Sequence, residues 1–479
     1  MKILYYNWTQ FDNTNNEGGG VNVYQKNLID YMLKETNNEI YFLSSGTYYD
    51  LFNKKTYIKE SKNIFGDKCK TYKLINSKCL APASAMYDDI NTYLSDVEDY
   101  EALKNFINKC GGFDVIHFNN IEGLSLNCLK IKKDFPNTKV VYSLHNYFFC
   151  CPKVNLFYND EENCTDYQDG KLCKKCLKKI VSKKKIILFY KIDRISENLH
   201  MTGINKKIKW HAKNLLKKLK KKNAQVKSED AQQEFNCDFK EYRDKSIEVI
   251  NDYVDVVLAV SNRVREIAIK YGIKQDKIFT DYIGTKVAET ETGKLNNRES
   301  KTQDFNIAYM GYFNKQKGFD FLVEALEKMP EDIAKEINFY CYAKIKDEND
   351  RINVEKIKKL NEKLNSATHI NGYNHKDLPD IYKNIDLGIV PVIWEDNLPQ
   401  VAIEYVAYGV PILCSDLGGA QELSEAKEFV FKAGDINDFQ EKITNIINKR
   451  DLLKKYFDKK KKLTTMEEHI NSLMEFYNE

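Results

Sequence analysis

Short apolar stretches of strand length alternate along the chain with longer amphipathic stretches of helix length, which is typical of doubly wound parallel sheets. In the first half, this pattern predicts buried strands at residues 2–6, 39–43, 115–118, 139–144 and 256–260. In the second half, it predicts strands at residues 306–309, 337–342, 369–370, 387–390, 411–414 and 429–431. We therefore expect two tandem α/β units, each with its own mainly parallel sheet.

The polar stretch at residues 289–304 separates the two series and is too hydrophilic to be buried, so we interpret it as a linker or long loop. A chain of 479 residues also exceeds the roughly 250 to 300 residues at which a single hydrophobic core stops growing. We expect one domain over residues 1–288, a second over 305–450 and a C-terminal helix within 451–479. Residues 46–110 give no clear pattern.

An insertion at residues 150–240 interrupts the first series of strands. Its second part, residues 205–222, holds nine lysines and no acid, with apolar residues at helical spacing. This basic amphipathic helix is either the solvated face of an insertion or a surface for an anionic membrane or a lipid diphosphate. Under the second interpretation, residues 206–222 make a peripheral membrane contact.

Charge and composition exclude several classes of protein. The 74 basic and 70 acidic side chains leave a net charge of +4, so we expect no nucleic-acid partner. No apolar stretch approaches the roughly 18 to 20 residues that span a bilayer, and the amino terminus runs directly into a predicted strand without an export signal. We expect a cytoplasmic protein, with the basic helix as its contact to the inner face of the membrane.

Twelve cysteines in a chain without an export signal indicate reduced thiols or a metal site. Cys151, Cys164, Cys173 and Cys176 cluster in the insertion, and the last two have the two-residue spacing that binds one metal ion from two sides. We expect structural zinc, with free thiols, an iron–sulfur cluster and disulfides as the alternatives. Cys150 competes with Cys151 as the fourth ligand.

The strongest chemical signal is a pair of acids after the predicted strand at 387–390. A loop carries Asp396, and the following helix carries Glu404. An ionised carboxylate can accept hydrogen bonds from both hydroxyls of a ribose, and the loop at Asn397 and Leu398 offers amides for a sugar or a phosphate. An isolated pair of acids would more often be solvated, so the surrounding sequence has to decide.

Two further blocks suit phosphate. In the second half, Gly311 ends a predicted strand, and Lys315 and Lys317 begin the next helix, where cations can stabilise a diphosphate leaving group. Lys315 alone would equally suit ordinary solvated surface. In the first half, Gly18, Gly19 and Gly20 open a helix, where the backbone and free amides can approach a donor phosphate or an acceptor sugar.

His145 ends the predicted strand at 139–144, and ligands of such sheets gather at the carboxyl ends of strands. A lone histidine is usually a core or loop residue, so the position alone does not decide its role. His117, at the end of the preceding strand, and Ser261 are secondary candidates for the same cleft.

Together these blocks resemble the retaining nucleotide-sugar glycosyltransferases of family 4, whose signature is an acid, seven residues and a glutamate in the second domain. The spacing from Asp396 to Glu404 fits, and the glycines of the family follow in Gly409-Val410-Pro411 and Gly418-Gly419. The first acid of the family is usually glutamate. Glu395 stands beside Asp396, so the sequence leaves open which of the two acts.

The resemblance implies the GT-B fold, with two Rossmann-like domains facing across a cleft and the C-terminal helix crossing back to the first domain. It also implies that Glu404 holds the ribose, that Asp396 and its loop hold the donor sugar, that Lys317 binds phosphate and that His145 faces the sugar. Two positions depart from the family: Tyr312 stands where arginine is common, and Asn146 replaces an acid after His145.

The implied reaction transfers a hexose-type sugar with retention of configuration to a glycan or lipid-linked acceptor, with the leaving phosphate as the base. The sequence does not identify the base; we take UDP as the nucleotide to expect first, with base recognition by the backbone near Gly372 and Tyr373. No Asp-x-Asp motif stands at a donor site, so we expect no catalytic metal. The alternatives are a nucleotide-sugar epimerase on a related fold and a non-catalytic nucleotide-sugar-binding protein.

Overall fold

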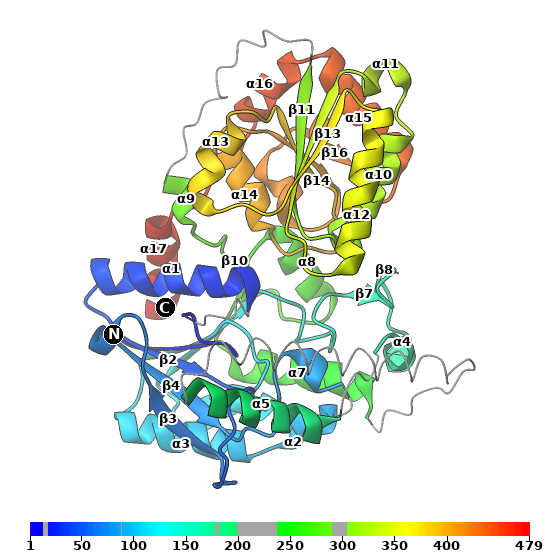
Figure 1. Cartoon of the computed structure of the whole chain (residues 1–479). Coiled ribbons are helices and arrows are strands. Elements are labelled where there is room, and N and C mark those ends of the chain that lie inside the picture. Colours follow the sequence, from blue (N-terminus) through cyan, green and yellow to red (C-terminus); the bar gives the residue numbers. More distant parts are fainter. Residues whose placement is uncertain (13–17, 88, 178–181, 199–236, 290–303) are drawn as a thin grey trace, which may run out of the picture.

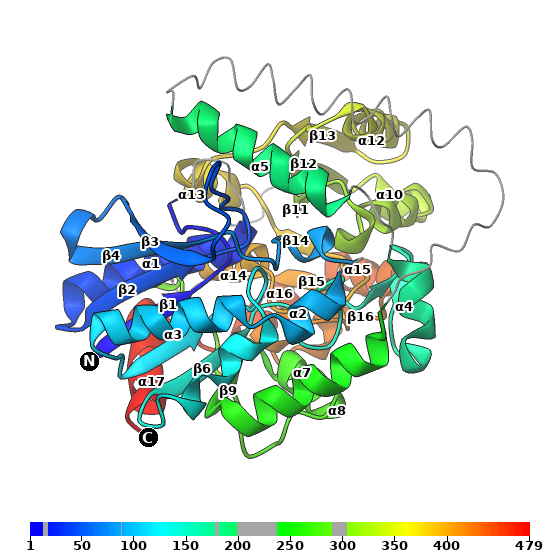
Figure 2. The same cartoon turned by 90° about the horizontal axis from the view of Figure 1, so that it is seen from below.

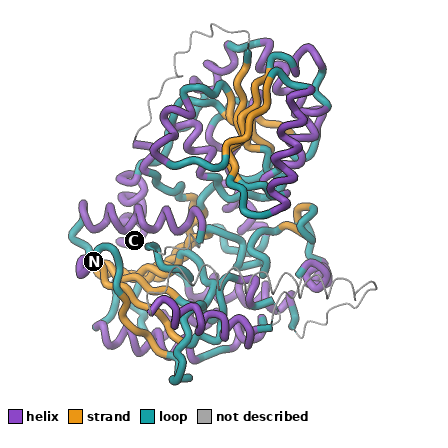
Figure 3. The backbone as a smooth tube through the Cα atoms, in the orientation of Figure 1, coloured by secondary structure: helices purple, strands orange, loops and turns teal. Residues whose placement is uncertain are grey.

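The structure is a computed structural model that describes residues 1–12, 18–87, 89–177, 182–198, 237–289 and 304–479. It contains two large sheets, one in each half of the chain, with helices on both faces of each (Figure 1). Figure 3 shows helices on either side of the strands in each half of the chain. The expected GT-B architecture of two Rossmann-like domains is confirmed.

The first sheet has eight strands in the order β10-β9-β6-β5-β1-β2-β4-β3, and only β3 is antiparallel to its neighbour. Its strands are β1 (Lys2–Tyr6), β2 (Glu39–Ser44), β3 (Tyr57–Ser61), β4 (Cys69–Ile75), β5 (Val115–Phe118), β6 (Lys139–Leu144), β9 (Val256–Ala259) and β10 (Ile278–Thr280). The five predicted strands are confirmed. The sequence did not reveal β3, β4 or β10, because β3 and β10 are edge strands with few buried side chains.

The second sheet has six parallel strands in the order β13-β12-β11-β14-β15-β16. They are β11 (Phe305–Gly311), β12 (Ile337–Ala343), β13 (Ser366–Ile370), β14 (Leu387–Val390), β15 (Ile412–Ser415) and β16 (Val430–Phe431). All six predicted strands are confirmed, with ends shifted by one to three residues in most cases. The strand order reverses between β11 and β14, and ligands of open α/β sheets bind at such a switch point, outside the carboxyl ends of the strands.

Helices connect most of the strands along the chain and lie on the faces of the two sheets. In the first half they are α1 (Gly19–Glu35), α2 (Ile90–Ser95), α3 (Glu98–Cys110), α4 (Lys171–Cys176), α5 (Lys183–Asn198), α7 (Phe239–Tyr253), α8 (Asn262–Lys270) and α9 (Lys286–Glu289). In the second half they are α10 (Phe319–Glu327), α11 (Glu331–Ala334), α12 (Glu348–Lys359), α13 (Leu378–Tyr382), α14 (Gln400–Ala407), α15 (Ile436–Asn448), α16 (Asp451–Asp458) and α17 (Met466–Asn478).

The C-terminal segment returns to the first domain as α17, which lies against α1 (red in Figures 1 and 2). The segment forms two helices, α16 and α17, instead of one. The Tyr477 hydroxyl lies 2.6 Å from Nδ1 of His117, and the Tyr24 hydroxyl lies 2.6 Å from Nε2 of His469. Both histidines are buried, so these contacts fix α17 onto the first sheet.

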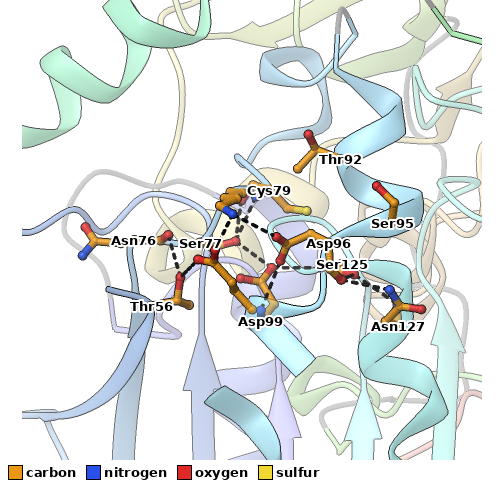
Figure 4. Close-up of polar contacts among 12 residues, drawn as sticks. Thr56, Asn76, Ser77, Cys79, Thr92, Ser95, Asp96, Asp99, Ser125 and Asn127 are labelled. Carbon is orange, nitrogen blue, oxygen red and sulfur yellow. Dashed lines mark hydrogen bonds and ion pairs between the residues drawn. The ribbon is translucent and has the colours of Figure 1, made fainter. Parts of the chain in front are cut away.

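A buried polar cluster organises the region that the sequence left unassigned (Figure 4). Oδ2 of Asp99, on α3, accepts hydrogen bonds from the Ser77 hydroxyl at 2.8 Å and from the Ser125 amide at 3.0 Å. The Ser125 hydroxyl in turn donates to the carbonyl of Asp96 at 2.6 Å. Burial raises the pKa of Asp99 to about 7. The cluster therefore joins the loop after β4, the start of α3 and the loop after β5.

Part of the insertion is well defined. A short hairpin, β7 (Phe157–Tyr158) and β8 (Glu162–Asn163), is followed by α4 and α5. The predicted basic helix at 206–222 and most of the predicted linker at 289–304 lie outside the described residues. Among the residues that the structure describes, no helix combines the length and apolarity needed to cross a membrane.

Candidate active site

The carboxyl ends of the two sheets meet at the loop after β14. In this loop, the Asn397 side-chain amide donates to the carbonyl of Leu144, at the end of β6, at 3.3 Å. The Ser261 hydroxyl, just after β9, donates to the carbonyl of Asn397 at 2.7 Å. Gln400, at the start of α14, donates to the carbonyl of Gly20 at 3.1 Å. The predicted donor loop and the glycine block of the first domain therefore lie side by side.

Lys317 and Asp396 form the central charge pair of this region. Nζ of Lys317 lies 2.5 Å from Oδ2 of Asp396 and 5.6 Å from the centre of the Trp394 ring. The Asp396 carboxylate is buried, so its charge depends on this lysine for compensation. Gly318 makes the approach of the two loops feasible, because a Cβ at this residue would stand 1.6 Å from the carbonyl oxygen of Pro391.

Glu395 has a different set of partners. Its carboxylate accepts two hydrogen bonds from the Arg263 guanidinium of α8, one of them from Nε at 2.9 Å. Its Oε2 also accepts from the amide of Gly418 at 3.1 Å. Glu395 thus forms a bidentate ion pair with Arg263 of the first domain, whereas Asp396 pairs with Lys317 of the second. This geometry favours Asp396 as the first acid of the motif.

The paired glycines after β15 fix the backbone of the loop that carries Asp396 and Asn397. The amide of Gly419 donates to the carbonyl of Asp396 at 2.9 Å. A Cβ at Gly418 would stand 2.1 Å from the carbonyl oxygen of Asp396, and one at Gly419 would stand 2.4 Å from that of Asn397. Gly418 also has a φ of 69°, which favours glycine. Any side chain here would displace the loop.

Glu422 ties the second domain to α8. Its carboxylate accepts from the amides of Asn262 and Arg263 at 2.9 and 2.8 Å, and from the Tyr282 hydroxyl at 2.6 Å. A carboxylate at the first turn of a helix satisfies free amides and interacts favourably with the positive end of the helix dipole. Glu422 therefore orients the helix that carries Arg263.

Glu404 is a buried acid on α14, with 8% of its surface exposed. Burial raises the pKa of its carboxyl to about 7, and the Tyr382 hydroxyl lies 3.5 Å from its Oε2. Burial, with a smaller contribution from the Glu404 charge, also raises the pKa of Tyr373. Gly372, beside Tyr373, has a φ of 78°.

His145 lies at the carboxyl end of β6, on the first-domain side. Its Nε2 lies 3.1 Å from Oδ1 of Asn119, and its ring centre lies 5.0 Å from that of Tyr24. Burial lowers the pKa of His145 to about 3, so the ring is neutral at pH 7. The neighbouring Asn146 amide donates to the buried carboxyl of Glu122 at 2.8 Å, a partner that the sequence did not indicate.

The glycine block begins α1 as expected. Gly18 precedes the helix with a φ of 84°, and a Cβ there would stand 2.4 Å from Cγ2 of Thr9. The helix starts at Gly19 with no side-chain cap, so its first amides have no partner from a capping side chain.

Some residues that the sequence predicted for the site do not lie beside the loop after β14 or do not line a cleft. Lys315 is exposed, and His117 is fully buried between Tyr477 and Ser143, so His117 does not line a cleft. Gly311 ends β11, and Tyr312 beyond it is 51% exposed. Nζ of Lys346 stands 3.6 Å from the centre of the Tyr312 ring. The sequence did not single out Lys346 or Arg263, because each contacts a residue distant in the chain, Tyr312 and Glu395 respectively.

A comparison with known families identifies the class of the second domain. Residues 293–463 match the family model described as "Glycosyl transferases group 1". Together with the two-sheet architecture, this match supports a GT-B glycosyltransferase.

Several solved structures share the fold over nearly the whole chain. Sucrose-phosphate synthase from Thermosynechococcus elongatus is 15% identical, with 100% of this chain and 98% of that chain covered and a TM-score of 0.58. The lipopolysaccharide outer core galactosyltransferase WaaB is 12% identical, with 99% of both chains covered and a TM-score of 0.55. Anabaena Alr3699/HepE in complex with UDP-glucose is 13% identical, with 100% and 99% covered and a TM-score of 0.52. These similarities show the fold.

One curated relative is similar in sequence. An uncharacterized 41.2 kDa protein in the cps region of Klebsiella pneumoniae is 27% identical over 179 residues. The alignment covers 36% of this chain and 46% of that protein, so it spans less than half of the relative's length.

The Arg263–Glu395 pair gives the first testable prediction. Arg263→Ala should weaken nucleotide binding about tenfold or more, because it leaves a buried carboxylate without its charged partner and loosens the loop that carries Asp396. The measurement is the dissociation constant of the nucleotide by titration calorimetry. Arg351→Ala is the matched control, because Arg351 is exposed and forms a surface pair with Glu348.

A double variant separates charge from geometry. In Arg263→Ala/Glu395→Gln the uncompensated charge is gone, so most of the lost affinity should return. If Arg263→Ala binds nucleotide as tightly as the unaltered protein, the pair does not position the donor loop.

Proposed function

We propose that this chain is a retaining glycosyltransferase that moves a hexose-type sugar from a nucleotide diphosphate sugar to a glycan or lipid-linked acceptor. The observation that carries the proposal is the Lys317–Asp396 pair, which lies at the switch point of the second sheet. The helix that follows the Asp396 loop, α14, contacts the glycine start of α1 through Gln400 and carries the buried Glu404. The match to glycosyl transferases group 1 adds support.

The nucleotide half of the donor would lie on the second domain. Glu404 would accept hydrogen bonds from the ribose hydroxyls, and the backbone at Gly372 and Tyr373 would receive the base. We propose UDP as the nucleotide, because Anabaena Alr3699/HepE, which shares the fold, is described in complex with UDP and with UDP-glucose. Lys317 and the backbone amides at the start of α1 would then stabilise the diphosphate.

The sugar half would lie between the domains. Asp396 and the amides of Asn397 and Leu398 would hold its hydroxyls, and neutral His145 would contribute a hydrogen bond without a charge. Transfer breaks the bond from the anomeric carbon to the phosphate oxygen and forms one to the acceptor oxygen on the same face. The acceptor proton passes to the leaving phosphate, so the scheme needs no protein nucleophile. The negative charge that develops falls on the diphosphate, next to Lys317.

The acceptor and location extend the proposal. One protein of the same fold is described as a lipopolysaccharide outer core galactosyltransferase, which fits an acceptor in polysaccharide or glycoconjugate synthesis. The enzyme would act in the cytoplasm, with residues 206–222 as the contact to the inner face of the membrane.

Thermal unfolding with millimolar UDP, GDP, ADP, CMP and TMP tests the donor site. A ligand at about a hundred times its dissociation constant adds about 2.7 kcal/mol to the native state, which raises the melting temperature by several degrees. We expect the shift with UDP. Incubation with UDP-hexoses then separates the activities: a transferase slowly releases UDP and free sugar, whereas an epimerase converts the donor sugar. Epimerised donor, or no shift with any nucleotide, would contradict the proposal.

A further inference from the structure

The four clustered cysteines of the insertion line one small cavity. Cys151 follows β6 after a turn, Cys164 follows β8 directly, and Cys173 and Cys176 lie on α4. The cavity has a volume of about 20 Å³, which suits a single ion or water better than an organic ligand. All four thiols are free in the structure. The chain has thus brought together cysteines from three separate segments.

A buried cation lines the same cavity. Arg243, on α7, is 5% exposed, and its Nε donates to the carbonyl of Cys150 at 2.9 Å. Its guanidinium stacks on Tyr167 and Tyr271, at 3.4 and 4.4 Å from the ring centres. Within the described part of the chain, no carboxylate forms an ion pair with it. A buried charge without a partner is costly, so the site calls for a negative group beside the cysteines.

The backbone around the cysteines is strained and has little regular structure. Its two strands are two residues each. Six of the seven described non-glycine residues with positive φ lie in this segment, namely Val154, Leu156, Asn159, Asp160, Gln168 and Asp169. Such conformations persist only where the surroundings hold them, and a segment without its own core usually needs a cross-link. One contact already resembles a metal knuckle, since the Asn159 amide donates to Sγ of Cys176 at 3.1 Å.

We propose that Cys151, Cys164, Cys173 and Cys176 bind one structural Zn²⁺. The four thiols would release four protons, and four thiolates around one Zn²⁺ carry a net charge of −2 that Arg243 would partly offset. Among the described residues, no three His, Cys, Asp or Glu side chains are arranged to hold a metal ion. Binding therefore requires the thiols to rotate about their Cα–Cβ bonds until each Sγ stands about 2.3 Å from the ion.

The metal would also shape the active site, a point that rests on the proposed function. Leu156 and Cys164 line a second cavity of about 160 Å³ together with Arg263 and Glu395. The cysteine segment is therefore one wall of a space that reaches the donor loop. Zinc would hold this wall in place next to the loop that carries Glu395 and Asp396.

Metal analysis of the full-length protein, purified under reducing conditions, tests the site independently of activity. We expect about one zinc per chain by plasma mass spectrometry, and loss of that zinc in Cys173→Ser/Cys176→Ser. Cys110→Ser, which alters a thiol outside the cluster, should keep the zinc. Less than a tenth of an equivalent of zinc in the unaltered protein after purification with added zinc, or an equivalent of iron in its place, would overturn the proposal.

A chemical measurement on the unaltered protein tests the same site if the double variant does not fold. Iodoacetamide labelling of the unaltered protein, read by peptide mass spectrometry, should leave the four cysteines unmodified until a chelator is added. Equal labelling with and without the chelator, or a disulfide between any two of the four, would overturn the zinc site. The proposed glycosyltransferase would survive that result, because a nucleotide-induced rise in melting temperature does not depend on the cysteines.

Discussion

Replacing Lys317 with alanine is expected to lower kcat/KM for sugar transfer by roughly 10²- to 10³-fold, the usual cost of removing one charge-stabilising donor. The variant loses the cation that we propose to stabilise the leaving diphosphate, and it leaves the buried Asp396 without its partner. Steady-state kinetics with the nucleotide sugar that the binding experiments identify would measure the loss. Lys328→Ala is the control, since Lys328 is an exposed lysine paired with Glu324 on the far end of α10.

A double variant separates the two consequences of losing Lys317. Lys317→Ala should lower the melting temperature, because the buried Asp396 carboxylate is left without its cation. Lys317→Ala/Asp396→Asn removes that charge, so its melting temperature should return towards that of the unaltered protein while its activity stays low. A Lys317→Ala enzyme with near-normal rates would show that the diphosphate does not bind here.

Glu404→Gln is expected to weaken nucleotide binding by about ten- to a hundredfold, because hydrogen bonds to a charged acceptor contribute about 1.5–3 kcal/mol. Burial raises the pKa of Glu404 to about 7, so the free protein holds this group mostly protonated at pH 6 and mostly ionised at pH 8. The ribose hydroxyls donate best to the ionised form. Affinity of the unaltered protein should therefore rise between pH 6 and pH 8, and that of Glu404→Gln should not.

Titration calorimetry at pH 6, 7 and 8 with UDP and with 2′-deoxy-UDP checks this prediction. The deoxy nucleotide should show a smaller pH dependence, because it lacks one of the two hydroxyls. Glu331→Gln, at an exposed position, serves as the control and should behave as the unaltered protein. Identical affinity of Glu404→Gln and the unaltered protein at pH 8 would remove Glu404 from the nucleotide site.

The strands could be predicted wherever they are buried on both faces. β1, β5, β6 and β14 have the predicted bounds, because every apolar residue in them faces a covering layer and the apolar run ends with the strand. β3 and β4 escaped prediction. β3 (Tyr57–Ser61) lies at the edge of the sheet and has no fully buried side chain. β4 (Cys69–Ile75) lies between β2 and β3, but its two lysines and its mixture of buried, half-buried and exposed positions interrupt the apolar run.

The candidate active site could also be predicted only in part. The spacing of Asp396 and Glu404 shows from sequence that both belong to one loop and the helix after it, and the paired glycines show that the backbone is tightly packed nearby. The partners of these residues could not be predicted. Glu395 and Asp396 are adjacent acids, yet one pairs with Arg263 and the other with Lys317, at sequence separations of 132 and 79 residues.

The sequence by itself determined the two α/β units and the positions of their buried strands, and it predicted the acids, lysines and glycines of a donor site, because burial and tight turns leave local patterns. Only the tertiary structure decided that Arg263 pairs with Glu395 and that Glu422 accepts hydrogen bonds from the first amides of α8. It also decided that Tyr477 contacts the buried His117 and that four cysteines line one cavity. These pairings depend on how the two sheets face each other and where α17 returns. Each of these contacts joins segments that are far apart in the sequence, so no local sequence pattern predicts it.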